Sequence, residues 1–178
     1  MAFKNRIHFI TLIIAGLALL GAAACARTRS DSSTQNASAP SPSPKLLAAA
    51  DLAKLRWIEG TWRGTGIDQP PFYERYKFEN DSTLVVETLA DETLSKVNDT
   101  SRFELKDGHF GNSEGGSVSV ATALDDNSIS FAPVGKGNYF RFQRESENSW
   151  KAILNWTGKD GTAKERIYHM ERVSPKKQ

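Results

Sequence analysis

The sequence predicts an all-β domain, a single antiparallel up-and-down barrel of about nine or ten strands, with a short helix that caps one end. Three observations lead to this prediction. Short runs rich in β-branched and aromatic residues recur between turn signals along most of the chain. Several of these runs alternate apolar and polar side chains, as antiparallel strands do when one face of the sheet is wet. One segment with a helical pattern precedes the first strand.

The first 24 residues are predicted to be a signal peptide that takes no part in the fold. Lys4 and Arg6 form a short basic head, and an uncharged apolar run follows from Ile10 to Ala24. Such a run is short for a membrane span and is typical of a secretory signal. A retained anchor helix is an alternative interpretation of the same run.

The signal ends at Gly21-Ala22-Ala23-Ala24-Cys25, which resembles the lipobox of bacterial lipoproteins. In that family the chain is cut before the cysteine, which then carries acyl chains such as palmitate. Cys25 is the single cysteine of the chain, so an internal disulfide is excluded. The resemblance implies a lipid-anchored protein of the bacterial cell envelope, and Ala26 favours the outer membrane, facing the periplasm. A plain signal peptide cut at an A-x-A site is the other alternative.

Residues 25–45 are expected to form the lipidated cysteine and a tether, because this Ser- and Pro-rich segment has too few large apolar residues to offset its ordering entropy. Residues 46–178 remain for one domain with its own core.

The chain has 23 basic and 21 acidic residues, and removal of Lys4 and Arg6 leaves 21 of each, a formally neutral protein. Since no basic stripe is present, nucleic acid is not an expected partner.

The helix is predicted over Leu46–Trp57, where Leu47, Leu52 and Leu55 share one side. A helix this short is not stable alone, so it must dock on the strands that follow. The strands are predicted at Thr61–Gly66, Pro71–Glu79, Thr83–Leu89, Thr100–Lys106, Ser117–Leu124, Ser128–Pro133, Asn138–Arg144, Trp150–Trp156 and Ala163–Val173.

The first strand opens with Gly60-Thr61-Trp62, directly after the helix. This G-x-W pattern resembles the calycin superfamily, which includes the lipocalins and the fatty-acid-binding proteins. The resemblance implies a calycin-like barrel in which Trp62 plugs the closed end and an arginine near the last strand packs across it. Arg172 is the candidate for that arginine, with Arg166 second. A guanidinium on an indole face makes a favourable cation–π contact.

Two narrower resemblances point to different functions. Residues 52–173 are similar to uncharacterised bacterial lipocalin-like domains, through L-x-W-x-x-G-x-W at Leu55–Trp62, Glu74-Arg75-Tyr76, and Tyr168 to Arg172. Residues 55–66 also resemble the opening motif of nitrobindin, which implies haem held by a histidine near the C-terminus, here His169. However, an inward Arg172 would turn His169 toward solvent, because alternate residues of a strand face opposite ways.

Eleven side chains are candidates for contact with a ligand in the barrel. These are Trp62, Phe72, Glu74, Tyr76, Phe78, Phe140, Phe142, Trp150, Trp156, Tyr168 and Arg172. Glu74 is the exception on an otherwise aromatic strand face, and a carboxylate there needs a cationic or hydrogen-bonding partner. Arg141, Arg144, Arg166 and Arg172 are all possible partners. Aromatic side chains in a barrel of this size can either line a cavity or fill a packed core.

No catalytic constellation is recognisable, and the protein is not expected to be an enzyme. The glycine-rich stretch Gly111–Gly116 connects strands and is interpreted as a loop at the barrel mouth. His109 is expected to be exposed, and no metal-ligand spacing is present. Apart from haem through His169, no cofactor is expected.

The leading functional hypothesis is therefore a lipid-anchored envelope protein that binds a small apolar or amphipathic molecule inside a β-barrel. The first alternative is a filled barrel that serves as a structural or protein-interaction module. The second alternative is a haem-binding, nitrobindin-like protein. The identity of a ligand does not follow from the fold.

Overall fold

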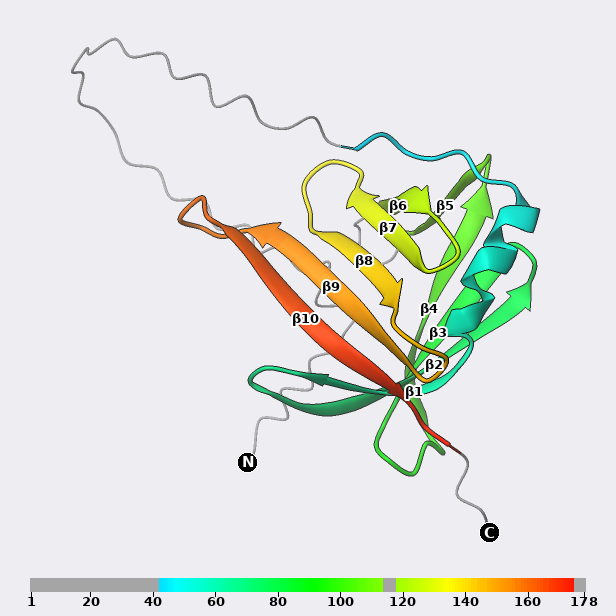
Figure 1. Cartoon of the computed structure of the whole chain (residues 1–178), viewed down its shortest axis with the longest axis vertical. Helices are drawn as coiled ribbons and strands as arrows, with labels where there is room; N and C mark the ends of the chain where they lie inside the picture. The colour runs from blue at the N-terminus through cyan, green and yellow to red at the C-terminus, as the bar shows by residue number, and fades with distance from the viewer. Residues whose placement is uncertain (1–41, 114–117, 175–178) are drawn as a thin grey trace, which may run out of the picture.

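The computed structural model of the chain describes residues 42–113 and 118–174, which form a closed antiparallel barrel of ten strands (Figure 1). Each strand pairs with its neighbours in sequence, and β1 pairs with β10 to close the ring. The strands are β1 (Gly60–Gly66), β2 (Gln69–Asn80), β3 (Thr83–Leu89), β4 (Val97–Lys106), β5 (His109–Asn112), β6 (Ser119–Leu124), β7 (Ser128–Pro133), β8 (Tyr139–Arg144), β9 (Ser149–Thr157) and β10 (Ala163–Arg172). The predicted fold class is confirmed. The predicted signal peptide and Cys25 lie outside the described residues.

One strand was not predicted individually. β5 covers His109–Asn112, part of which the sequence suggested was loop. It is short and contains Gly111, and a Cβ at that glycine would lie 2.0 Å from the carbonyl oxygen of Ser119. A glycine is therefore needed where β5 and β6 approach each other closely. His109 is exposed, as expected.

The predicted helix is a 3-10 helix, η1, over Ala49–Ile58, so it begins three residues later than the pattern indicated. Asp51 supports its first turn by accepting a hydrogen bond from the backbone N–H of Ala48 at 2.8 Å. Leu52, Leu55 and Ile58 are fully buried against the barrel. Before the helix, the backbone N–H of Lys45 donates to the carbonyl of Ala121 in β6, so this part of the predicted tether is docked on the sheet.

The barrel has two different ends. The helix precedes β1 and lies where β2, β4, β8 and β10 finish, and this is called the helix end (Figure 1). The connections β1–β2, β3–β4, β7–β8 and β9–β10 lie at the opposite end, called the far end. This arrangement follows from an up-and-down topology, in which successive connections alternate between the two ends.

Aromatic rings fill the helix half of the barrel. Phe103 of β4 lies 6.2 Å from Phe142 of β8, and Tyr76 of β2 lies 6.4 Å from the same ring, measured between centroids. These strands are four positions apart around the barrel, so the rings meet across its interior. Trp150 packs against Tyr76 at 5.4 Å and is fully buried. Edge-to-face contacts at these distances add to the hydrophobic burial. At this level the interior is packed core.

Trp62 and Arg172 close the helix end as the resemblance implied. The Trp62 ring is buried, and its Nε1 donates to the carbonyl of Ile58 at 2.7 Å. The Arg172 guanidinium lies 4.1 Å from the Trp62 ring and donates to the carbonyls of Glu59 and Trp57. The arginine thus joins the last strand to the end of η1, and it satisfies carbonyls that the short helix leaves unpaired.

Three glycines share the inner face of β1 with Trp62, and each is covered by a side chain from a neighbouring strand. A Cβ at Gly60 would lie 2.2 Å from Nη1 of Arg172, one at Gly64 would lie 2.1 Å from the Phe72 ring, and one at Gly66 would lie 2.7 Å from the Tyr168 ring. The alternation of tryptophan with glycine therefore has a packing cause. The glycines leave space over β1 that residues of β2 and β10 occupy.

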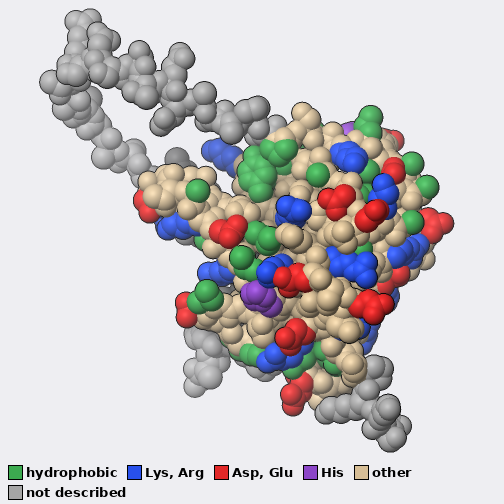
Figure 2. All heavy atoms as spheres, viewed as in Figure 1, with side chains coloured by type: hydrophobic (Ala, Val, Ile, Leu, Met, Phe, Trp, Pro, Cys, Tyr) green, Lys and Arg blue, Asp and Glu red, His purple; other side chains and the backbone are tan. Residues whose placement is uncertain are grey.

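The surface has no strong electrostatic bias on the face shown in Figure 2, where acidic and basic side chains are interspersed. Within residues 42–113 and 118–174, no helix has the length and apolar character that a membrane crossing requires.

Candidate functional site

A cleft opens at the far end of the barrel, where β1 and β10 separate. Their pairing covers only Trp62–Thr65 with His169–Arg172, although β10 continues back to Ala163. Beyond Thr65 the chain turns at Ile67-Asp68 and returns as β2, since Gly66 pairs with Gln69. The two edges therefore diverge (Figure 1), and the molecule is hollowed between the projecting β1–β2 and β9–β10 turns (Figure 2).

The cleft has a volume of about 650 Å³, which is within the range of small-molecule sites. Its walls combine apolar and charged side chains. It is lined by Thr65, Gly66, Ile67, Asp68, Trp156, Glu165, Arg166, Ile167 and His169. Ile67 is 79% exposed on one lip, and Trp156 is half-buried on the other. Ile67 and Trp156 thus give the cleft two apolar side chains that a ligand could contact.

Arg166 lies between two aromatic residues, Trp156 in the lining of the cleft and Tyr168 behind it. Its guanidinium lies 5.9 Å from the Trp156 ring, and its Nη1 donates to the hydroxyl of Tyr168 at 3.4 Å. Tyr168 in turn makes an edge-to-face pair with Phe72, with ring centroids 5.7 Å apart. These two rings meet over Gly64 and Gly66, on the inner face of β1, and the pair is called the floor. It lies behind the lining of the cleft, which reaches Tyr168 through Gly66 and Arg166.

Glu74 lies one inward position below this floor, on the same face of β2 as Phe72. It is fully buried, and its Oε2 accepts a hydrogen bond from the Tyr76 hydroxyl at 2.7 Å. Within the described chain its Oε1 has no hydrogen-bond partner. Burial raises the pKa of Glu74 from 4.5 to about 7, against the lowering effect of the Tyr76 hydrogen bond. Near neutral pH, this carboxyl is therefore poised between its acid and its carboxylate.

No arginine partners Glu74 among the described residues, so the expected cationic partner is corrected to the Tyr76 hydroxyl. Each of the four candidate arginines is engaged elsewhere. Arg141 donates to Ser128, Arg144 to the carbonyl of Ser146, Arg166 to Tyr168, and Arg172 to carbonyls at the helix end. Tyr76 follows Glu74 by two residues and shares its strand face, a spacing that the sequence already contained.

Three further buried polar atoms lack partners among the described residues, namely Nε1 of Trp57, Oγ of Ser101 and Nε1 of Trp150. Trp150 packs against both Tyr76 and Trp62, the two residues beside Glu74. One of these unpaired donors, Nε1 of Trp150, thus belongs to a ring that packs on the neighbours of Glu74, whereas buried polar groups are normally hydrogen-bonded.

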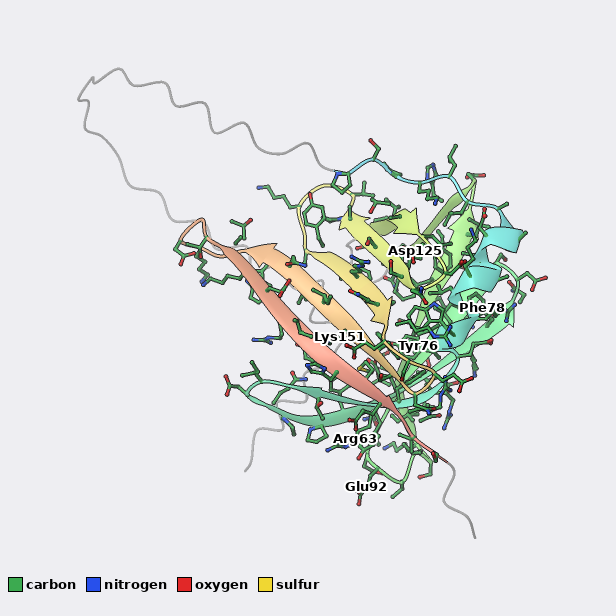
Figure 3. The ribbon with its side chains drawn as sticks, viewed as in Figure 1. Arg63, Tyr76, Phe78, Glu92, Asp125 and Lys151 are labelled. Atoms are coloured by element: carbon green, nitrogen blue, oxygen red, sulfur yellow. The ribbon has the colours of Figure 1, made fainter. Side chains whose placement is uncertain are left out.

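The eleven predicted contact residues fall into three groups. Of these residues, Trp156 alone lines the cleft, and Phe72 and Tyr168 form the floor behind its lining. Glu74 follows Phe72 on the inner face of β2. The others belong to the packed interior or close the helix end: Trp62, Tyr76, Phe78, Phe140, Phe142, Trp150 and Arg172. Phe78 lies beside η1, under the guanidinium of Arg56 at 4.2 Å, while Tyr76 is further inside (Figure 3). Sequence reasoning did not single out Ile67 or Glu165, because only the divergence of β1 from β10 brings them together.

His169 reaches the rim of the cleft from the outer face of β10. Its side chain is exposed, and carboxylates of Glu165 and Asp68 share the same lining. Haem needs a largely apolar enclosure around its axial histidine, so the residues around His169 do not fit that group. Within the described part of the chain, no three His, Cys, Asp or Glu residues are grouped as a metal site would require.

No family model matches the chain, and no curated protein matches it. Among solved structures, one similar chain is a protein of unknown function from the DUF3598 family of Nostoc punctiforme PCC 73102, at 17% identity and a TM-score of 0.45. The match covers 77% of this chain and 53% of that one, so this chain spans about half the length of that protein.

A structure of EF1p2_mFAP2b bound to DFHBI is similar at 14% identity and a TM-score of 0.35, covering 67% of this chain and 97% of that one. A structure of a redesigned β-barrel, mFAP1, bound to DFHBI is similar at 13% identity and a TM-score of 0.32, and the match covers 66% of this chain and 96% of that one. At such scores these similarities carry no argument about function, and the fold is assigned here from the strand pairing itself.

Replacement of Glu74 by glutamine should remove a pH dependence of stability. In the folded chain the Glu74 carboxyl keeps its proton up to about pH 7, whereas in the unfolded chain it loses the proton near pH 4.5. The stability that the protonated carboxyl contributes is thus fully present below pH 4.5 and is lost as pH rises through 7. We expect the free energy of unfolding of the unaltered protein, relative to Glu74→Gln, to fall by about 3 kcal/mol between pH 4 and pH 8.

Urea titrations of both proteins across this pH range measure the difference. Glu165→Gln, which removes an exposed carboxyl at the cleft, is the matched control for the loss of one ionisable side chain. A constant difference between the unaltered protein and Glu74→Gln would show that Glu74 titrates as it does in water.

Proposed function

We propose that this protein binds a small amphipathic molecule in the cleft at the far end of its barrel, and that an acylated Cys25 holds it on the bacterial outer membrane, facing the periplasm. The cleft is the observation that carries the binding proposal. It has the volume of a small-molecule site, and its walls pair Ile67, Trp156 and Ile167 with Arg166 and His169. Such a lining suits a ligand with an apolar body and a polar group.

The place of binding differs from the centre of the barrel that the sequence suggested. Rings of β2, β4 and β8 meet across the helix half and leave the ligand no room there. The far end is different, because β10 runs on for six residues without β1 as a partner. A ligand at this position would lie against Ile67 and Trp156, in front of the Phe72–Tyr168 floor.

The aromatic packing of the interior also favours the alternative of a filled barrel that acts as a structural or protein-interaction module. Phe131 and Phe140 stack at 4.5 Å, and Phe103 contacts both rings, as in an ordinary hydrophobic core. Under this alternative, the cleft would be a surface groove without a small-molecule ligand.

Native mass spectrometry of the full-length chain, purified from a bacterial host, separates these functions. We expect a mass excess that matches a small molecule, and we expect Trp156→Ala to reduce the ligand-bound fraction several-fold. Tyr139→Ala, a substitution of another partly exposed aromatic residue at the far end, is the control and should retain the ligand. A protein with no bound mass, and no binding of added amphiphiles, would favour the filled-barrel module. An absorption band near 400 nm that disappears in His169→Ala would favour haem.

The anchor is supported by the lipobox-like sequence before Cys25 and by the uncharged run that precedes it. The mass of the membrane-extracted protein tests it directly. We expect an N-terminus at Cys25 with acyl chains attached, since more than one chain is needed for stable anchoring. Cys25→Ser should abolish both the cleavage and the added mass. A mature chain that begins elsewhere, without acyl mass, would contradict the anchor.

A further inference from the structure

The lining of the cleft connects to the buried carboxyl of Glu74 through two aromatic residues. Gly66 and Arg166 line the cleft and lie next to Tyr168, whose ring packs edge to face on Phe72. Phe72 and Glu74 are successive inward residues of β2, and Trp62 of β1 is paired with Glu74. A group that reached Glu74 from the cleft would therefore have to part the Phe72 and Tyr168 rings.

Glu74 has one oxygen left for a partner outside the described chain. Its Oε2 is bonded to Tyr76, and its Oε1 is buried without a hydrogen bond. All four arginines that could have neutralised it are engaged elsewhere, as shown above. A buried carboxylate without a cation is unfavourable by several kcal/mol, whereas one that meets a cationic donor forms a strong, charge-assisted hydrogen bond.

The position of Glu74 also favours a cation over an anion. Its neighbours Tyr76 and Trp62, on β2 and β1, are buried aromatic residues, so the carboxyl lies in a desolvated site. Opposite charges attract more strongly where water is excluded. An anionic head group would meet the opposite situation, because it would be placed beside a buried acid.

We propose that Glu74 recognises the ligand's head group, and that this head group is a protonated amine that passes between Phe72 and Tyr168 while its apolar part lies in the cleft. This inference rests on the proposed function and names the chemical class of its ligand. The amine donates to Oε1, and Glu74 gives up its proton to solvent as the ion pair forms. Arg166, bonded to the Tyr168 hydroxyl, holds one side of the entrance.

Three probes with the same apolar chain test this assignment: hexylamine, hexanol and hexanoate. The full-length chain is held in phospholipid nanodiscs at pH 7.4 and titrated with each probe, and binding is followed by tryptophan fluorescence. Empty nanodiscs correct for partition of the probes into lipid. We expect hexylamine to bind about tenfold more tightly than hexanol, which is the effect of one charge-assisted hydrogen bond, and hexanoate to bind most weakly.

Glu74→Gln keeps the shape of the side chain and should fold, because it removes a buried ionisable group. It should weaken hexylamine about tenfold, with hexanol changed less than about twofold. Glu147→Gln, an exposed carboxyl in the β8–β9 connection at the helix end and outside the cleft lining, is the matched control and should leave the order of the three probes unchanged.

The inference fails if hexanoate binds most tightly, or if Glu74→Gln weakens all three probes equally. Binding of the probes without a preference among head groups would overturn the role of Glu74 and leave the cleft as a binding site. If no probe binds to the unaltered protein, the binding function itself is contradicted.

Discussion

The structure depends on the inner face of β1, which carries one tryptophan and three glycines. Because the glycines have no side chains, groups from β2 and β10 pack over this strand from both sides. At the helix end Arg172 covers Trp62 and ties the last strand to η1. Toward the far end Phe72 and Tyr168 meet above the same strand. β1 therefore forms a thin part of the barrel wall, and side chains of β2 and β10 fill the space inside it.

This wall explains why the two halves of the barrel differ. In the helix half, aromatic rings meet across the interior, and the core excludes a ligand. In the far half, β1 ends at Gly66 while β10 extends beyond it, so the wall opens into a cleft. Glu74 lies at the boundary, next to Phe72 on the inner face of β2, and among the described residues its carboxyl is hydrogen-bonded to Tyr76 alone. The site proposed for a ligand is therefore a consequence of how the barrel closes.

Much of this could be predicted from the sequence, because alternation and turn residues report on local structure. Nine of the ten strands, the helix before β1 and the Trp62–Arg172 contact were expected. The four-residue strand β5 was not, since Gly111 and Asn112 resemble loop residues and only their contact with β6 makes them a strand. The partner of Glu74 was expected among distant arginines, although Tyr76 was two residues away. The cleft depends on where the β1–β10 pairing stops, and no local pattern encodes that register.

The claim that rings from neighbouring strands close over the bare face of β1 can be tested at Gly64. A methyl group there would lie 2.1 Å from the Phe72 ring, so Gly64→Ala should lower the free energy of unfolding by about 1–3 kcal/mol through overpacking. In a Phe72→Ala background the same substitution should cost much less, because the clashing ring is gone. The most direct measurement is this double-mutant cycle by urea denaturation. An equal cost in both backgrounds would contradict the account.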